Sequence, residues 1–375
     1  MKIFAPFAAA GLLACASLLG QLANPAAVAA PADAQPESAL PAAEAKAAAL
    51  ELAGMLEEGY VFPDTAKSYA AALRTKAAAG AYDSPSTAAA FAERLTADLR
   101  AVSPDNHLRV MVGAPGTRGQ PSAPPAGRRP FGPPIEDARV IAPGIAYIRF
   151  AAFLGSDEEV EAVRKFMNDH LDAKTIIFDI RTHRGGGLAE MDAMLPYLFS
   201  RPTTLVTMDT RLSVDRAGGN PLAEEPTLRR VATDEDVARR EHFVTPHPTE
   251  KRLFDAKVIL LTSNITASAA EHFSLAMKRT GRATLIGETT GGAGHYGGVR
   301  PLAGKFGVFI PVGRTFDPDT GEGWEGTGVA PHVAVPAEQA LVEALVRSGV
   351  AKAEAERLSA EIGPKGPFVR QRPRA

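Results

Sequence analysis

The sequence predicts an α/β protein with a helical region at its N-terminal side. Between residues 145 and 311, short apolar runs rich in Ile, Val and Leu alternate with longer segments of helical spacing, which is typical of layered α/β domains. Residues 42–101 are instead dominated by Ala, Leu, Glu and Lys, which are strong helix formers. A chain of 375 residues is long enough for one large domain and a smaller one.

The first residues have the layout of a secretory signal. Lys2 precedes an apolar stretch over residues 3–22, and Ala-Val-Ala at residues 27–29 fits a small-x-small cleavage site. We therefore expect residues 1–29 to be a signal peptide and the protein to be exported to the periplasm or the outside of the cell. A retained membrane span is the alternative, because the stretch is close to the lower limit of about 18 residues.

The chain has one cysteine, Cys15, which lies inside this apolar stretch. Its setting after Leu-Leu-Ala resembles a lipoprotein box, so a lipid anchor at Cys15 is a further alternative to cleavage. Because the only cysteine lies in the expected signal segment, the mature chain has no free thiol for a disulfide, a nucleophile or a thiolate metal site.

Two segments precede the α/β region. Helical patterns over residues 42–78, interrupted near Tyr60, and over residues 86–101 are followed by a strand-like run from His107 to Val112, and we assign residues 40–112 to an N-terminal helical subdomain. Residues 113–136 are filled with Gly, Pro, Arg and Ser, which predicts a loop or linker.

The α/β core is expected over residues 137–349. Apolar runs predict strands, and helical spacing predicts helices between them. The expected strands are residues 145–149, 175–180, 258–262, 284–286 and 308–311, and the expected helices are residues 157–169, 188–199 and 269–279. We interpret the charged segment 214–249 as a surface excursion that covers or borders the functional site, and residues 350–375 as a C-terminal tail.

Charge and histidine spacing exclude several classes of function. The chain has 41 basic and 43 acidic residues, so it lacks the broad basic field that nucleic-acid binding requires. There is no His-Glu-x-x-His pattern, and the nearest pair of histidines, His242 and His247, has no flanking ligand cluster. We expect no metal, no cofactor, no nucleic-acid partner and no membrane association beyond a lipid anchor.

The apolar run at residues 258–262 leads into a turn at Ser268, directly before a predicted helix. A serine in a strand-to-helix turn exposes its oxygen, and the free amides of the helix N-terminus can stabilise a negative charge there. This pattern suits a nucleophile. Ser268 followed by Glu271 is equally a capping box, so the pattern alone leaves both interpretations open.

Glycine-rich turns follow two other predicted strands. Residues 185–187 are all glycine, and consecutive glycines let backbone amides approach a ligand, as in an oxyanion hole or a phosphate cradle. A phosphate-binding loop is excluded because no Gly-Lys-Ser/Thr follows, and a plain tight turn is the alternative. We interpret Asp179 and Arg181 as a charged pair that shapes this turn. The second turn is Gly-Gly-Ala-Gly at residues 291–294, after Gly-Glu-Thr-Thr.

These segments, in this order and together with Glu-Gly-Thr-Gly-Val-Ala-Pro at residues 325–331, resemble the S41 peptidase family over about residues 42–349. The resemblance implies a crotonase-like core of repeated ββα units with an attached helical subdomain. It also implies a serine peptidase that acts on peptides or unfolded protein segments, with Ser268 as the nucleophile. It further implies an oxyanion hole formed by two backbone amides. One is the amide of Ala269, and the other belongs to Gly185, Gly186 or Gly187.

The base differs between branches of the family. Processing peptidases use a lysine in the second glycine-rich turn, and this chain has none there. The chain is closest to the tricorn and retinoid-binding branch, whose pattern implies His107 as the base, Glu325 as its distal polar partner and Asn106 in place of a serine. Histidine can take a proton from serine at neutral pH, since its ordinary pKa is near 6.5. His295 is the rival base.

Two other functions remain open. A relative of the retinoid-binding proteins could carry an apolar ligand on the same fold, and the same site could hydrolyse esters. The presence of the serine, the histidine and the glutamate favours an enzyme, because a carrier has no need of all three.

Overall fold

The computed structural model describes residues 39–84, 86–113, 133–303, 305–364 and 368. The expected signal peptide, its cleavage site and Cys15 lie outside these residues, as does most of the expected linker. Among the helices that are described, none is both long and apolar enough to span a membrane.

The N-terminal helices are confirmed as α1 (Ala42–Gly59), α2 (Pro63–Ala78) and α3 (Ala88–Val102). Proline suits the first position of α2, because an N–H there would have no helical partner. Before α3, Thr87 caps the helix by accepting the N–H of Ala90 at 3.2 Å. The three helices share a core with apolar residues of three strands, β1 (Arg109–Val112), β10 (His295–Leu302) and β11 (Phe306–Phe316).

The α/β part is built on a mostly parallel sheet with the strand order β12-β9-β8-β4-β3-β2. Only β2 runs antiparallel to its neighbour, and the other pairs are parallel. The carboxyl ends of β4 and β8 therefore lie side by side at one edge. The strands are β2 (Ile135–Ala142), β3 (Ile145–Phe150), β4 (Thr175–Asp179), β8 (Lys257–Thr262), β9 (Thr284–Gly287) and β12 (Val333–Ala334).

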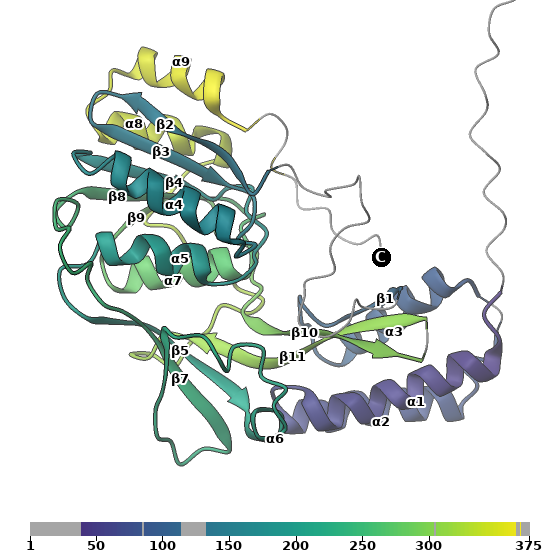
Figure 1. Ribbon diagram of the computed structural model, residues 1–375. Coiled ribbons are helices and arrows are strands. Elements are labelled where there is room, and N and C mark those ends of the chain that lie inside the picture. Colours follow the sequence, from purple (N-terminus) through teal and green to yellow (C-terminus); the bar gives the residue numbers. More distant parts are fainter. Residues whose placement is uncertain (1–38, 85, 114–132, 304, 365–367, 369–375) are drawn as a thin grey trace, which may run out of the picture. The chain divides into compact units, whose positions relative to one another are not determined.

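Helices cover both faces of this sheet (Figure 1). Helices α4 (Asp157–Asp169), α5 (Ala189–Met194) and α7 (Ala269–Arg279) pack on one face, and α8 (Ala340–Arg347) and α9 (Lys352–Ile362) on the other. Successive residues of β3 alternate between the two cores, as the pleat of a strand requires. Burial on both faces explains why the central strands are apolar throughout. The mixed α/β class is thereby confirmed.

The segment expected to be a C-terminal tail contains α9, which differs from our expectation. Ala355, Leu358 and Ile362 of this helix are buried against the parallel sheet. Their spacing is helical, but the many charges between them concealed the apolar stripe in the sequence.

An antiparallel sheet joins the helical region to the α/β part. Its order is β1-β11-β5-β7-β6, and β10 also pairs with β11. The further elements are β5 (Thr203–Arg211), α6 (Leu212–Arg216), β6 (Leu228–Arg230) and β7 (Val237–Val244). Our interpretation of residues 214–249 as a surface excursion was therefore wrong for β6 and β7. Alternate residues of β7 are buried, but they include Arg240 and His242, so the inward face is not apolar.

The predicted helix over residues 188–199 is shorter than expected. Helix α5 ends at Met194, and a 3₁₀ turn covers Leu195–Tyr197. Pro196 has no N–H to donate to the preceding turn, which explains the change.

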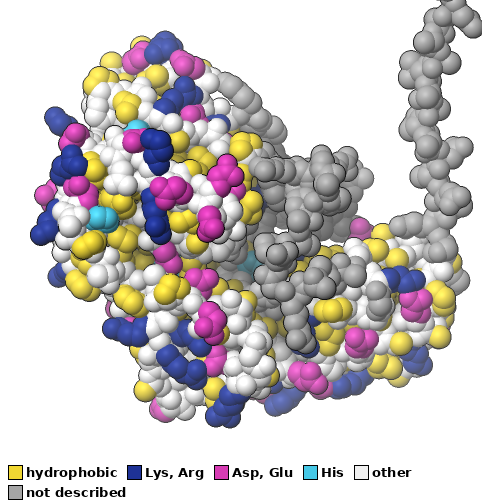
Figure 2. Space-filling model, viewed as in Figure 1, with side chains coloured by type: hydrophobic (Ala, Val, Ile, Leu, Met, Phe, Trp, Pro, Cys, Tyr) yellow, Lys and Arg dark blue, Asp and Glu magenta, His cyan; other side chains and the backbone are white. Residues whose placement is uncertain are grey.

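Basic and acidic side chains are interspersed over the face shown in Figure 2, so this face has no large region of one charge.

Candidate active site

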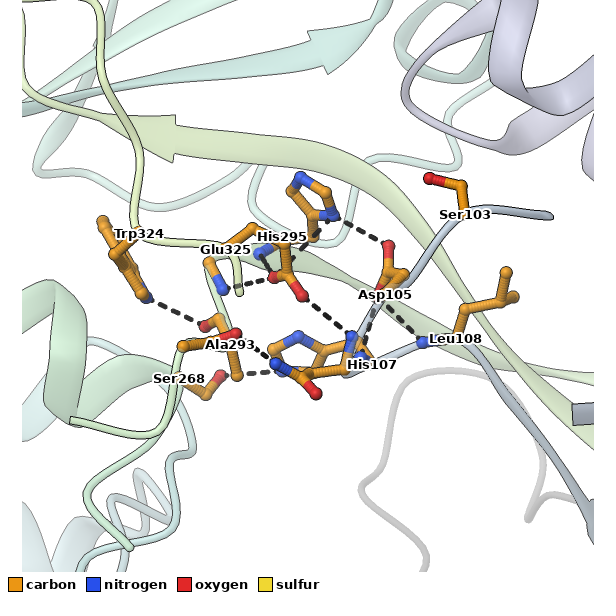
Figure 3. Close-up of polar contacts among 12 residues, drawn as sticks. Ser103, Asp105, His107, Leu108, Ser268, Ala293, His295, Trp324 and Glu325 are labelled. Atoms are coloured by element: carbon orange, nitrogen blue, oxygen red, sulfur yellow. Dashed lines mark hydrogen bonds and ion pairs between the residues drawn. The ribbon is translucent and has the colours of Figure 1, made fainter. Parts of the chain in front are cut away.

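Ser268 lies directly before α7, in the turn that follows β8. Its φ of 58° and ψ of −120° belong to a region that residues with a side chain rarely adopt. Such strain persists only when neighbouring contacts hold it, and it is common at active sites. Here the carboxylate of Glu271 accepts the Ser268 N–H at 2.9 Å. The serine hydroxyl is directed at another residue, His107 (Figure 3).

Glu271 is fully buried and ties the second glycine-rich turn to the start of α7. Besides the Ser268 N–H, it accepts the hydroxyl of Thr290 at 2.6 Å and the N–H groups of Gly292 and Ala293 at 2.6 and 2.8 Å. The glutamate predicted as part of a capping box thus anchors a second loop as well. These hydrogen bonds hold the backbone at Ser268 and the backbone of the second glycine-rich turn in place.

The first glycine-rich turn lies against Ser268 because it follows β4, the neighbour of β8. A Cβ at Gly185 would be 2.7 Å from Ser268 Cβ, and one at Gly186 would be 1.8 Å from the Phe153 carbonyl oxygen. Both glycines also have positive φ, 114° and 140°. No larger residue fits either position without displacing backbone.

The N–H groups of this turn are unequally engaged. The Gly185 N–H donates to His183 Nδ1 at 3.0 Å, and the Gly187 N–H donates to the Phe153 carbonyl at 2.8 Å. Within the part of the chain that the structure describes, the N–H groups of Gly186 and Ala269 have no partner. These two donors line the same pocket as the serine.

His183 is completely buried, and this burial lowers its pKa to about 3. The ring is therefore neutral at pH 7 and can accept the Gly185 N–H. Its edge packs on Phe153 with the ring centroids 4.2 Å apart. His183 thus helps to hold the glycine turn, and no hydrogen bond between its ring and Ser268 is found among the described residues.

The predicted pair of Asp179 and Arg181 is confirmed. Both side chains are at most 1% exposed, and Arg181 Nε and Nη2 donate to the two carboxylate oxygens at 2.8 and 2.6 Å. Although burial opposes ionisation, Arg181 holds the pKa of Asp179 below its usual range. The Arg181 carbonyl accepts the hydroxyl of Ser263 at 2.5 Å, which ties the end of β4 to the loop that leads to the serine.

His107 reaches Ser268 from the connection between α3 and β1, although the two residues are 161 positions apart. Its Nε2 lies 3.2 Å from Ser268 Oγ. The ring stacks on Phe309, with a centroid distance of 5.3 Å and an interplanar angle of 27°. Burial lowers the pKa of His107 to about 4, although the charge of Asp105 opposes this shift. The imidazole is therefore neutral at pH 7.

Asp105 is the site residue that our sequence reasoning missed. Its side chain is buried and accepts the backbone N–H groups of His107 and Leu108 at 2.8 and 3.0 Å. It also accepts the Tyr60 hydroxyl at 2.9 Å and His295 Nδ1 at 2.8 Å. An aspartate that bonds the backbone two residues on is a common turn pattern, and this was the available signal.

The ring of His295 is engaged by Asp105 and packs against Phe62, with the centroids 5.5 Å apart. Although burial of Asp105 favours its neutral form, the hydrogen bond with His295 keeps the Asp105 pKa below its usual range. His295 lines the pocket but makes no hydrogen bond with Ser268 among the described contacts. The geometry therefore favours His107 over its rival.

Glu325 and Asn106 meet through the backbone. Glu325 Oε1 accepts the Asn106 backbone N–H at 2.8 Å, and Oε2 accepts the N–H groups of Gly294 and His295 at 2.6 and 3.2 Å. The Asn106 side chain instead donates to the Gly292 carbonyl. It thus does not bridge the base to Glu325, and His107 Nδ1 is buried without a hydrogen-bond partner among the described residues.

One group of described side chains has the spacing of a metal site. Single ligand-type atoms of Asp105, His107 and Glu325 lie within 4.8 Å of one another. All four carboxylate oxygens of this group already accept hydrogen bonds from N–H or O–H donors. We therefore describe it as a polar network around the histidine.

The serine and the histidine open into a pocket of about 360 Å³. Apolar side chains form much of its wall, among them Leu188, Met208, Leu222, Phe309 and Trp324. A hydroxyl beside a neutral imidazole, with two unused N–H donors close by, can carry out acyl transfer.

Comparisons with known proteins identify the family and the fold. The family model "Peptidase family S41" matches residues 144–335, and the model "N-terminal domain of Peptidase_S41 in eukaryotic IRBP" matches residues 42–137. Among solved structures, a proposed peptidase from Parabacteroides merdae is 15% identical, with a TM-score of 0.55, 82% of this chain covered and 97% of the other. A lipoprotein from Streptococcus agalactiae is 13% identical, with a TM-score of 0.50 and the same coverage, 82% and 97%. At such identities these likenesses show a shared fold.

Proposed function

The chain belongs to peptidase family S41 and is a serine peptidase, and we propose that Ser268 is its nucleophile and His107 its general base. We further propose that the N–H groups of Ala269 and Gly186 form the oxyanion hole. The observation that carries the proposal is the 3.2 Å contact between His107 Nε2 and Ser268 Oγ at the pocket. The two residues are far apart in the sequence, so the fold brings them together.

The proposed reaction begins with proton transfer. His107 is neutral at pH 7 and takes the hydroxyl proton as Ser268 Oγ attacks the peptide carbonyl carbon. The developing oxyanion accepts hydrogen bonds from Ala269 and Gly186. The protonated histidine then gives its proton to the leaving amine, and water, activated by the same histidine, releases the acyl group from the serine.

Charge around the histidine supports its role as a base. An imidazolium at His107 would have the carboxylates of Asp105 and Glu325 close by, within the 4.8 Å group described above. Because His107 Nδ1 has no hydrogen-bond partner among the described residues, we infer that Phe309 and the Asp105 contact to its backbone orient the ring. Glu325 would act at a distance, through its charge and through its hydrogen bond with the Asn106 backbone N–H.

The substrate is a peptide or protein. We propose endopeptidase cleavage of unfolded segments, because an open pocket that contains both the serine and the histidine can admit an extended chain. We also propose the crotonase-like ββα plan for the core, and export to the periplasm or the cell exterior through residues 1–29. No finding favours the carrier or the esterase as the alternative.

Labelling with a fluorophosphonate probe tests the proposal. We expect the purified mature protein to be labelled, with the adduct mapped by mass spectrometry to Ser268. Alanine at Ser268 should abolish labelling, and alanine at His107 should slow it by at least about 10³-fold, since the hydroxyl loses its base. An adduct on another residue, or an unlabelled wild type that binds an apolar ligand tightly, would refute the proposal.

The pH dependence of kcat/KM should reflect the buried histidine. Only the neutral imidazole can accept a proton, and burial lowers the His107 pKa to about 4. Activity should therefore persist from neutral pH down to about pH 5 and fall steeply as the pH approaches 4. A profile that already falls at the ordinary histidine pKa, near 6.5, would contradict this prediction. Circular dichroism at each pH distinguishes loss of activity from unfolding.

A further inference from the structure

A second series of hydrogen-bonded polar groups, which does not include His107, reaches the pocket. His272 lies one turn after Ser268 on α7, lines the pocket and is 3% exposed. Its Nε2 lies 2.8 Å from His242 Nδ1, and His242 Nε2 lies 2.8 Å from Asp192 Oδ1. The other Asp192 oxygen accepts the Thr227 hydroxyl at 2.6 Å. The proposed mechanism uses none of these groups.

The direction of the hydrogen bonds from Asp192 through His242 to His272 determines whether His272 offers a donor or an acceptor to the pocket. An ionised carboxylate only accepts hydrogen bonds, so His242 must donate from Nε2 to Asp192. When His242 carries only this proton, it accepts at Nδ1, and His272 donates from Nε2. The remaining nitrogen, His272 Nδ1, is left as an acceptor without a hydrogen-bond partner among the described residues. Burial keeps the His272 pKa well below its usual value, so the ring stays neutral.

Two other polar side chains of the pocket wall are already engaged. Trp324 Nε1 donates to the Ala293 carbonyl at 3.0 Å, and the Tyr296 hydroxyl pairs with Thr210 at 2.7 Å. Leu188 and Met208 contribute only apolar surface. Thr315 and His295 also line the pocket, and the rest of the wall around the acceptor on His272 is largely apolar.

A ligand that fills such a pocket removes water from this acceptor. Leaving a buried acceptor without a donor costs about 1–3 kcal/mol, so a site built in this way discriminates against ligands that cannot donate. We propose that the pocket receives the side chain on the acyl side of the cleaved bond and selects one with an apolar body and a terminal hydrogen-bond donor. Tyrosine meets both requirements, and phenylalanine lacks the donor. This proposal rests on the proposed peptidase function.

Peptidyl diphenylphosphonates test the selectivity directly, because they label a reactive serine and carry a defined side chain next to the phosphorus. Two probes that differ only in tyrosine or phenylalanine are compared by their labelling rates on the full chain. We expect the wild type to favour the tyrosine probe by about 10-fold, the size of one hydrogen bond. The ratio should fall to about one in His272→Leu and to an intermediate value in His242→Leu. His272→Gln, which keeps an acceptor, should restore part of it.

The ratio is taken within each variant, so a general loss of reactivity cancels. His170→Leu is the matched control, since both ring nitrogens of His170 lack hydrogen-bond partners among the described residues and it does not line the pocket. A wild-type ratio near or below one, or a ratio that survives in His272→Leu, overturns the inference. Failure of the proposed function is distinguishable, because the fluorophosphonate probe, which has no such side chain, would then also leave Ser268 unlabelled.

Discussion

Alanine at Ser268 is expected to lower kcat for peptide hydrolysis on the order of 10⁶-fold, the loss that follows removal of an activated serine. The hydroxyl is the only group that the proposed reaction uses to form the acyl-enzyme. The unused N–H donors of Gly186 and Ala269 remain in place, so a residual rate above that in water should persist. Hydrolysis of a quenched fluorescent peptide, followed over days, measures this residual rate.

The same substitution at His107 should cost nearly as much, and the double variant little more than either single one. Serine and histidine act as a unit across the 3.2 Å contact, so their effects are far from additive. Additive losses would mean that the histidine does not activate Ser268. Ser274→Ala is the control, because Ser274 is a buried serine of α7 whose hydroxyl, among the described residues, bonds the Ala270 carbonyl alone. It should retain the wild-type kcat.

The second large effect is expected on stability. Asp179→Ala should lower the free energy of unfolding by about 3–5 kcal/mol, because it leaves the buried charge of Arg181 without its partner. The substitution also removes the acceptor of the Tyr147 hydroxyl, which donates to Asp179 at 2.6 Å. Urea unfolding, followed by circular dichroism, measures the change.

A double variant separates the ion pair from simple loss of packing. Asp179→Ala combined with Arg181→Met removes both charges, and we expect it to be more stable than Asp179→Ala alone. If the double variant were less stable, the unpaired charge would not be the main cost. Glu354→Ala breaks a surface pair with Arg357 and should leave the unfolding midpoint unchanged, since exposed ion pairs contribute little.

Much of the fold could be predicted from local patterns. Helices α4 and α7 begin and end at the predicted residues, because each has a helical apolar stripe and a capping acid and hydroxyl at its start. The central strands were visible as apolar runs. Strand β7 was not, because Arg240 occupies an inward position. It is tolerated there by its pairing with Asp215 at 2.9 Å, a contact between residues 25 positions apart.

The candidate site divides in the same way. The position of Ser268 at a strand-to-helix turn and the need for glycine at residues 185 and 186 follow from local backbone requirements. Their chemical roles stay predictions until they are measured. By contrast, the choice between His107 and His295 could not be made from spacing, because both are simply histidines beside turns.

What the sequence by itself determined is the local structure of the strongly patterned segments: the N-terminal helices, α4, α7 and the central strands, and where the backbone must turn tightly. It could do so because periodicity, capping and glycine requirements act over a few residues. Only the tertiary structure decided that His107 meets Ser268, that Asp105 holds His295, and that the Asn106 side chain bonds Gly292. Those contacts depend on how the antiparallel sheet and the helices pack against the parallel sheet, and packing is a property of the whole chain.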